Sequence, residues 1–198
     1  MHVKSAIAAA ALVLAVGVTS AAAQDRDRRG DSREPVPDGG MLAVGGSVGA
    51  APPSEVSFTS GLALTGNVEG YLTRRVSLRG QVSGAFWDIT GRGFNGTVRP
   101  IATEGNVVYN FEGGRIHPFV TGGIGFYHYR FAEHPTTGSA NKPGADVGGG
   151  LEYFVHRHTT VTGEVLYHDV AEPVRSPVTT YGSTRYWTFT VGLKKYFR

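Results

Sequence analysis

The sequence lacks several features that commonly define the chemistry of a protein. Its 198 residues include no cysteine, which excludes a disulfide scaffold, a thiolate metal site and a cysteine nucleophile. Only 18% of the residues are charged, against about 25% in an average soluble domain. The basic residues are scattered, so the formal charge of +3 does not indicate a nucleic-acid-binding surface. No motif in the sequence predicts a cofactor.

The first 40 residues are predicted to lie outside the folded domain. Residues 1–23 combine Lys4, an apolar run from Ala6 to Val18 and a final Ala-Ala-Ala triplet, which is the pattern of a cleaved secretory signal peptide. Residues 24–40 are rich in Asp and Arg and contain almost no large apolar residue, so we expect a disordered, charged periplasmic tail. The remaining residues, 41–198, are predicted to form one domain.

From Met41 onward, apolar and polar residues alternate in segments that end at Gly, Pro or charged residues. This period of two is typical of half-buried β-strands, and no helical stripe or apolar run of about 18 residues interrupts it. The sequence therefore predicts an all-β fold. The eight expected strands are 41–50, 60–72, 75–87, 99–111, 115–130, 145–155, 159–169 and 185–197.

The connections between these segments fall into two classes. Three are tight turns, and the other four, 51–59, 88–98, 131–144 and 170–184, are longer and rich in Pro, Gly, Ser and Thr. Since consecutive strands of a meander run in opposite directions, the short turns share one end of the sheet and the long loops share the other. Bacterial outer-membrane barrels show this asymmetry.

Alternate positions give one apolar face and one polar face along every segment. The period alone does not say which face points outward, because a soluble, lipocalin-like ligand carrier has the same alternation with its apolar face inside. The polar face is rich in Gly, Ser, Thr and Asn with few charges, which favours a packed barrel interior over a water-exposed coat. The apolar face carries no charge near its middle, and its aromatics gather near the strand ends, as in the two girdles of a membrane barrel. The girdle positions are Phe86, Phe126, Tyr167 and Trp187 at the loop end and Tyr109, Phe111, Tyr153 and Phe197 at the turn end.

An open sheet edge in hydrocarbon would leave backbone N–H and C=O groups without hydrogen-bond partners, which costs several kcal/mol for each group. The first and last strands must therefore pair and close the barrel. Eight strands enclose a space that side chains nearly fill. Because a buried charge persists only when it is paired or hydrogen-bonded, the inward charges are expected to form a structural network that fills the lumen. An ion or proton path is the alternative interpretation. The network is predicted from Glu69, Arg79, Glu104, Glu152, Glu164 and Lys194.

On these features the chain resembles the small outer-membrane barrel superfamily of OmpA and OmpX type over residues 41–198. The most specific segments are His117 to Phe131, Gly144 to Val155, and the ending from Trp187 to Phe197. The resemblance implies a closed, eight-stranded, antiparallel, up-and-down transmembrane β-barrel in the outer membrane. It also implies that the last strand is a signal for the barrel-assembly machinery, that outer-membrane lipids and lipopolysaccharide surround the barrel, and that the protein is a monomer.

Members of this superfamily differ in function, so the role is argued from residues. We expect a structural or loop-mediated surface-binding role without enzyme activity. The alternative is a lipid A-modifying enzyme, which would need a His close to a hydroxyl group. The residues available for that chemistry at the loop end are His128, His168, Asp169, Ser176 and Ser183.

Three further patterns are better explained without a function. Gly91 to Gly96 matches G-x-G-x-x-G, but a strand rather than a helix follows it. The tripeptide Arg29-Gly30-Asp31 lies in a tail that is already rich in both charges. His156 and His158 flank Arg157 in a tight turn with no third metal ligand nearby, so no metal site is predicted.

Overall fold

The computed structural model describes residues 37–52, 61–91, 94–111, 114–133, 136–171 and 184–198. The predicted signal peptide and most of the charged tail lie outside these residues. Within the described ranges all regular structure is β-strand, and no helix long and apolar enough to span a membrane is found there. The strands are β1 (Leu42–Ala51), β2 (Gly61–Tyr71), β3 (Val76–Gly91), β4 (Phe94–Asn110), β5 (Ile116–Glu133), β6 (Thr136–His156), β7 (Thr159–Val170) and β8 (Thr184–Phe197).

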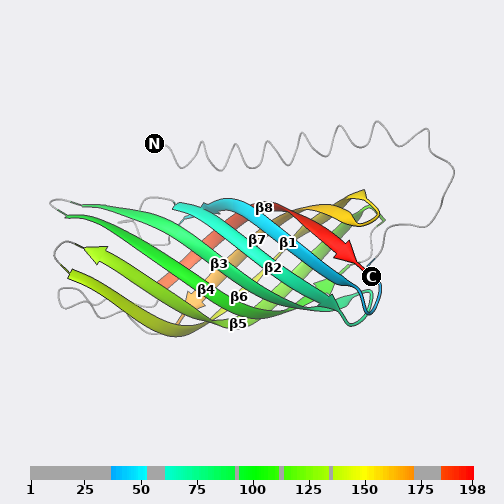
Figure 1. The fold of residues 1–198 in the computed structure, drawn as a ribbon, viewed down its shortest axis with the longest axis horizontal. Helices are drawn as coiled ribbons and strands as arrows, with labels where there is room; N and C mark the ends of the chain where they lie inside the picture. The colour runs from blue at the N-terminus through cyan, green and yellow to red at the C-terminus, as the bar shows by residue number, and fades with distance from the viewer. Residues whose placement is uncertain (1–36, 53–60, 92–93, 112–113, 134–135, 172–183) are drawn as a thin grey trace.

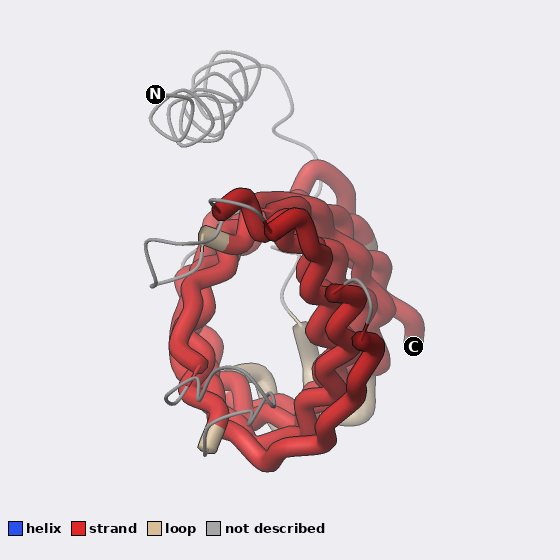
Figure 2. Tube along the Cα trace, turned by 90° about the vertical axis from the view of Figure 1, so that its left-hand side faces the viewer, coloured by secondary structure: helices blue, strands red, loops and turns tan. Residues whose placement is uncertain are grey.

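The eight strands form one closed antiparallel barrel, as the sequence predicts (Figures 1 and 2). Each strand pairs with the next, and β1 also pairs with β8 from Leu42 opposite Phe197 to Ala50 opposite Phe189. When register partners are followed once around the barrel from Leu42 of β1, the path reaches Trp187 of β8, whose N–H donates to the Pro52 carbonyl at 3.3 Å. The path thus returns to the first strand ten residues beyond its starting point. This offset means that the strands are tilted relative to the barrel axis.

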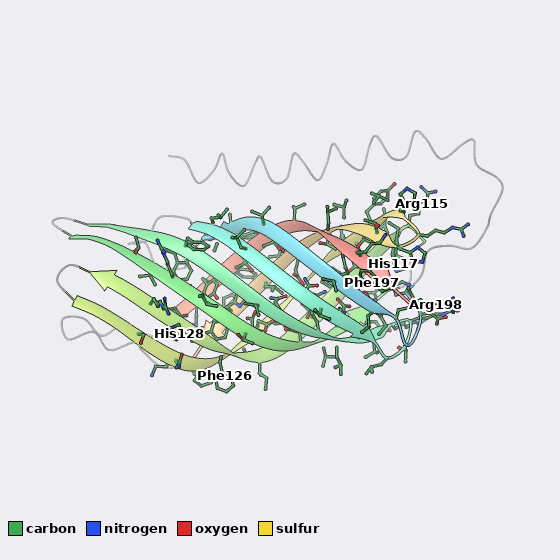
Figure 3. The ribbon with its side chains drawn as sticks, in the orientation of Figure 1. Arg115, His117, Phe126, His128, Phe197 and Arg198 are labelled. Atoms are coloured by element: carbon green, nitrogen blue, oxygen red, sulfur yellow. The ribbon has the colours of Figure 1, made fainter. Side chains whose placement is uncertain are left out.

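The apolar face of every strand points out of the barrel and the polar face points into it. Leu64 and Val82 are 44% and 53% exposed, whereas Glu104 is 3% exposed. An inward polar face of this kind is the reverse of a lipocalin interior, so the ligand-carrier alternative does not fit the fold. Exposed apolar side chains ring the barrel (Figure 3), which is the surface expected of a protein dissolved in lipid.

The short connections and the C-terminus share one end of the barrel, called here the turn end (Figure 1). Between β2 and β3, the Thr73 hydroxyl accepts hydrogen bonds from the backbone N–H groups of Arg75 and Val76 at 3.2 and 3.0 Å. Between β4 and β5, Gly114 has a φ of +64°, a conformation that favours glycine. At the same end the Gly39 N–H and the Arg74 guanidinium both donate to Asp38, and these contacts hold the pKa of that carboxyl below its usual value.

The opposite end, called the loop end, differs from the prediction. The segments 88–98 and 131–144 were expected to be long loops, yet most of their residues are paired strand. Asp88 to Gly91 pairs with Phe94 to Thr97, and β5 pairs with β6 as far as Glu133 opposite Thr136. The Pro, Gly and Thr content of these segments suggested loops. It is nevertheless compatible with strands here, because each segment folds back on itself and pairs as a hairpin. The other two expected loops, 51–59 and 170–184, lie largely outside the described residues.

These extensions make the central strands much longer than a membrane requires. A strand spans the hydrocarbon with about 9–11 residues, whereas β4, β5 and β6 have 17, 18 and 21. The β3–β4 and β5–β6 hairpins therefore project beyond the rest of the barrel at the loop end (Figure 1).

Candidate functional sites: the lumen and the outer face

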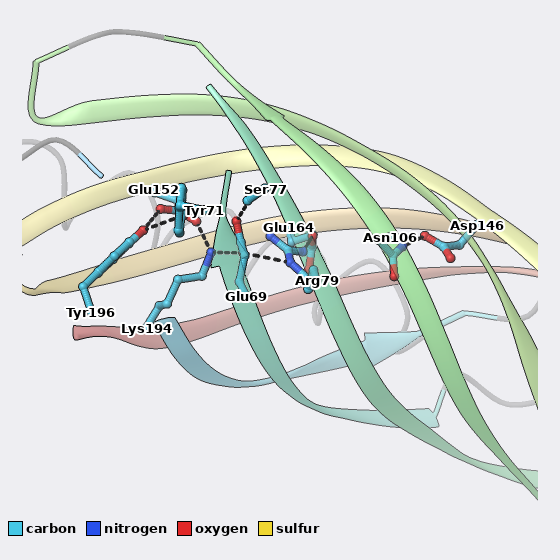
Figure 4. Close-up of polar contacts among 10 residues, drawn as sticks. All are labelled: Glu69, Tyr71, Ser77, Arg79, Asn106, Asp146, Glu152, Glu164, Lys194 and Tyr196. Carbon is cyan, nitrogen blue, oxygen red and sulfur yellow. Dashed lines mark hydrogen bonds and ion pairs between the residues drawn. The ribbon is translucent and has the colours of Figure 1, made fainter. Parts of the chain in front are cut away.

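The lumen near the turn end holds a network of buried ion pairs, called here the turn-end cluster. It comprises Glu69, Ser77, Arg79, Glu152, Glu164 and Lys194 together with the hydroxyls of Tyr71 and Tyr196 (Figure 4). Arg79 donates from Nε to Glu69 at 3.1 Å and from a terminal nitrogen to Glu164 at 2.5 Å. The Lys194 ammonium donates to Glu69 at 2.7 Å and also to Glu152. Each cation thus bridges two carboxylates, and the ionic residues come from β2, β3, β6, β7 and β8.

Aromatic rings border this cluster on both sides along the lumen. The hydroxyls of Tyr71 and Tyr196 are 3.2 Å apart, and Tyr196 also donates to Glu152. The Tyr196 ring packs on Phe154 at a centroid distance of 5.4 Å. On the other side of the cluster, the Arg79 guanidinium lies over the Phe119 ring at 5.2 Å, within the range of a cation–π contact. The charges are therefore enclosed by rings as well as by opposite charges.

A second polar group, the loop-end cluster, surrounds Glu104 further along the lumen. The sequence analysis assigned Glu104 to one network with Arg79 and Lys194, and the structure corrects this assignment. Glu104 instead accepts hydrogen bonds from Gln81 Nε2 at 3.0 Å and from the Ser83 hydroxyl at 3.2 Å. Which inward residues meet depends on strand tilt and register, and alternation alone does not give these.

Two further groups reach the same carboxylate. The Tyr127 hydroxyl donates to Glu104 Oε1 at 2.6 Å, and His168 Nδ1 lies 3.1 Å from the same oxygen. His168 Nε2 lies 3.2 Å from the Thr188 hydroxyl, so both ring nitrogens have partners. Three donors and an imidazole nitrogen thus surround one carboxylate, which satisfies most of its acceptor sites without a Lys or Arg.

The loop-end cluster also has an aromatic cover. The His168 ring stacks on Tyr186 at 4.5 Å, and Trp87 meets Tyr186 edge-on at 5.0 Å. The Trp87 indole N–H donates to the Ala51 carbonyl at 2.8 Å. The sequence analysis did not identify these inward aromatics. Their signal was present in the alternation, since Tyr127 and Tyr129 occupy inward positions beside the outward Phe126.

Between the two clusters, Asn106 of β4 donates to Asp146 of β6 over Gly123 of β5, which lies between them in the register. Figure 4 shows this pair further along the barrel than the turn-end cluster. Described side chains therefore occupy the lumen at successive levels from Tyr71 to Trp87.

The eight predicted girdle residues all lie on the outer face. Six of them are 38–71% exposed, and Tyr153 and Tyr167 are half-buried. Tyr167 lies opposite Trp187 in the register with ring centroids 4.9 Å apart, and Tyr109 meets Phe111 at 5.0 Å. The two sets lie toward opposite ends of the barrel, as Phe126 and Phe197 show in Figure 3.

The three candidate catalytic residues that the structure describes, His128, His168 and Asp169, do not come together. His168 was predicted at the loop end of its strand as a candidate for catalysis, but its side chain is fully buried in the lumen. The adjacent Asp169 points outward, where Arg185 Nε lies 3.4 Å from it. His128 also points outward, with Nδ1 2.6 Å from the Asn141 side-chain oxygen. Ser176 and Ser183 lie outside the described residues.

The remaining sequence patterns are placed as follows. The glycine pattern 91–96 spans the β3–β4 connection and is followed by strand. His156 and His158 are both exposed at the β6–β7 turn, and the described part of the chain holds no group of three or more potential metal-ligating side chains. The Arg29-Gly30-Asp31 tripeptide lies outside the described residues.

Comparison with known proteins agrees with the fold. The model of the outer membrane protein beta-barrel domain family matches residues 8–197, and the chain therefore belongs to this family. A comparison with curated proteins finds no match.

Several solved outer-membrane proteins have similar structures. OprG from Pseudomonas aeruginosa is 12% identical with a TM-score of 0.60, covering 84% of this chain and 100% of that one. The N-terminal barrel domain of OprF from the same organism is 15% identical with a TM-score of 0.54, covering 81% and 100%. Ail, the attachment invasion locus protein of Yersinia pestis, is 11% identical with a TM-score of 0.57, covering 80% and 99%. At these identities the likeness concerns the fold.

Proposed function

We propose that this protein is an integral outer-membrane barrel with a filled lumen, and that its role is structural or depends on surface binding at the loop end. The observation that carries the proposal is the series of buried side-chain layers across the lumen. The turn-end cluster, the Asn106 and Asp146 pair and the loop-end cluster follow one another along the axis. Eight-stranded barrels have little interior space beyond their side chains, so these layers favour a plug over a pore.

The proposed orientation follows from the two barrel ends. Outer-membrane barrels have short periplasmic turns and longer extracellular segments. The turn end therefore faces the periplasm, and the projecting β3–β4 and β5–β6 hairpins face the exterior. In this orientation the C-terminal strand β8 is the element that the barrel-assembly machinery would recognise, and lipopolysaccharide would surround the loop end.

Conductance and membrane fractionation test this proposal together. The protein should fractionate with the outer membrane and migrate differently on gels before and after boiling, because a folded barrel resists detergent. Purified protein in planar bilayers should give no steady channels. A soluble periplasmic protein would overturn the membrane assignment, and steady conductance would overturn the filled lumen.

The projecting hairpins favour surface binding as the specific role. Exposed loops on a rigid scaffold commonly carry function, and here the scaffold extends well beyond the length that a membrane needs. One structural neighbour is named for attachment and invasion, and its structure with a heparin analogue has been solved. Shortening the β5–β6 hairpin at its tip, around Glu133 and Thr136, should reduce surface adhesion while the barrel still resists detergent. Unchanged adhesion would argue against this role.

We propose no enzyme activity. His168 is enclosed by Glu104, Tyr127 and Thr188 in the lumen, where a lipid acyl chain outside the barrel would not reach it. Mass analysis of lipid A after overexpression should show an unchanged acyl pattern. A lost or added acyl chain would support the lipid A-modifying alternative.

A further inference from the structure

Two arginines lie directly opposite each other on the outer face near the loop end. Arg99 of β4 and Arg130 of β5 are cross-strand partners, and both side chains are exposed. One row closer to the middle of the barrel, Ile101 faces His128, and the next row pairs Thr103 with Phe126. Figure 3 shows Phe126 and His128 toward the end of the barrel opposite the C-terminus. The arginine pair thus lies just beyond an aromatic residue of the loop-end girdle.

Like charges in this position are unfavourable without a counterion. Cβ atoms of directly opposed residues are about 4.5–5.5 Å apart, and like charges there destabilise a sheet. The outward-facing side chains described on β3 to β6 include no carboxylate that would neutralise the pair. A membrane surface makes the repulsion stronger, because water screens charges less well there.

A second cross-strand pair near the loop end provides the contrast. Asp169 of β7 lies opposite Arg185 of β8, and the two side chains form an ion pair at 3.4 Å. This pair lies one row beyond Tyr167 and Trp187, so it too is just outside the aromatic girdle. One side of the barrel therefore neutralises its own charge at this level, and on the other side Arg99 and Arg130 have no carboxylate partner among the described side chains.

We propose that Arg99 and Arg130 bind a phosphate group on a phosphorylated glycolipid of the outer leaflet. Two guanidinium groups on adjacent strands can each donate paired hydrogen bonds to the same tetrahedral anion. Arg99 is already oriented, since its guanidinium lies 5.9 Å from the Phe86 ring centroid in a cation–π contact. His128, held by Asn141, lies one row below, where a sugar or acyl linkage would follow the phosphate.

The surface on which the pair lies indicates a lipid rather than a free ion. The residues that continue the same face toward the barrel middle are Phe126, Ile124 and Val120, which are 71%, 74% and 48% exposed. An acyl chain attached to the bound headgroup would cover this apolar strip. The inference rests on the proposed orientation, which puts the loop end in the outer leaflet.

The test measures stabilisation of the folded barrel by lipid in zwitterionic detergent micelles. The temperature at which the heat-modifiable gel band is lost is followed while lipopolysaccharide is added. We expect this temperature to rise with lipopolysaccharide, and the half-maximal lipid concentration to increase about tenfold in Arg99→Gln or Arg130→Gln, since each variant removes charge-assisted hydrogen bonds. Arg185→Gln is the matched control, which removes the same charge near the same barrel end and should leave the lipid response unchanged.

Lipid variants identify the ligand. Phosphatase-treated lipopolysaccharide should give little stabilisation, and phosphatidylglycerol should give less than intact lipopolysaccharide. Equal effects of the treated and untreated glycolipid would overturn the proposal. An equal effect of inorganic phosphate alone would show a site for a free anion, and an equal effect of phosphatidylglycerol would show a general anionic-lipid surface; both results contradict a glycolipid site.

Arg130→Glu gives an independent check that does not depend on weakened folding. It places a carboxylate opposite Arg99, so the barrel should be more stable than wild type without lipid and should lose the response to lipopolysaccharide. Asp88→Asn serves as a control near the same barrel end. It removes a carboxylate at the β3 position opposite Thr97 and should not weaken the lipid response. A wild-type lipid response in Arg130→Glu would refute the site. The micelle assay does not depend on how the barrel is oriented in a membrane. A refuted lipid site would therefore leave the proposed function, which is tested by fractionation and conductance, unaffected.

Discussion

Both lumenal clusters stabilise buried carboxylates, but they do so with different partners. In the turn-end cluster two cations are shared among three carboxylates, so every charged member depends on a charge of opposite sign. In the loop-end cluster one carboxylate is surrounded by an amide, two hydroxyls and an imidazole. Removing a buried ion's partner costs more than weakening one of several hydrogen bonds, so the two ends should respond differently to substitution.

The largest effect is expected at Lys194. Lys194→Met leaves Glu69 and Glu152 without the ammonium they share, and breaking a buried ion pair from one side costs about 3–5 kcal/mol. The free energy of unfolding in urea, measured in detergent or lipid vesicles, should fall by this amount. Lys195→Met is the control, because Lys195 is adjacent but exposed. Equal losses in both variants would mean that the ion pairs do not account for the effect.

A smaller loss is expected at Glu104. Glu104→Gln keeps an acceptor but removes the charge that strengthens the bonds from Tyr127 and His168, and it brings an amide toward donors. The expected loss of unfolding free energy is about 2–3 kcal/mol. A loss as large as that of Lys194→Met would show that the two clusters are energetically alike, against the comparison made above.

Gly125 tests how closely the loop-end cluster is packed. A Cβ at this position would lie 2.5 Å from the Thr103 carbonyl oxygen and 2.7 Å from Glu104 Cγ. Gly125→Ala should therefore cost about 1–2 kcal/mol through overpacking. Both variants are compared by their free energy of unfolding in urea. At Gly105 a Cβ would have no neighbour within 4 Å, so Gly105→Ala should change this free energy little.

The smallest effect is expected for the ion pair on the outer surface. Asp169 and Arg185 are about half exposed, and exposed pairs contribute about 0–1 kcal/mol. Arg185→Gln should lower the urea midpoint barely or not at all. A loss comparable with that at Glu104 would show that this pair is more desolvated than its exposure implies.

Much of the fold was predictable because alternation reports directly on burial. It placed Leu64 and Val82 outside and Glu69 and Glu152 inside, and counting the segments gave the closed eight-stranded barrel. The division of the lumen into two clusters was not predictable, because Glu104 meets His168 only through the tilt of strands far apart in sequence.

The loop end shows a second limit of sequence reasoning. Pro143 and the glycines around it suggested a loop, whereas the local pairing of β5 with β6 carries the strand through them. His168 was predicted to lie at the loop end of its strand, as a candidate for catalysis, but its side chain is fully buried and the neighbouring hairpins extend the barrel past that level. The Arg99 and Arg130 pair was similarly hidden, since 31 positions separate the two residues in the chain and only the register brings them together.

The pairing of β1 with β8 has a consequence for how the molecule folds. Leu42 of β1 is the register partner of Phe197 of β8, so the barrel cannot close until β8 has been made and delivered. Contacts between such distant positions slow folding, because the entropy of closing the whole loop is lost before any edge is protected. Until then the chain exposes two unpaired strand edges, which gives it a long interval in which aggregation competes with assembly.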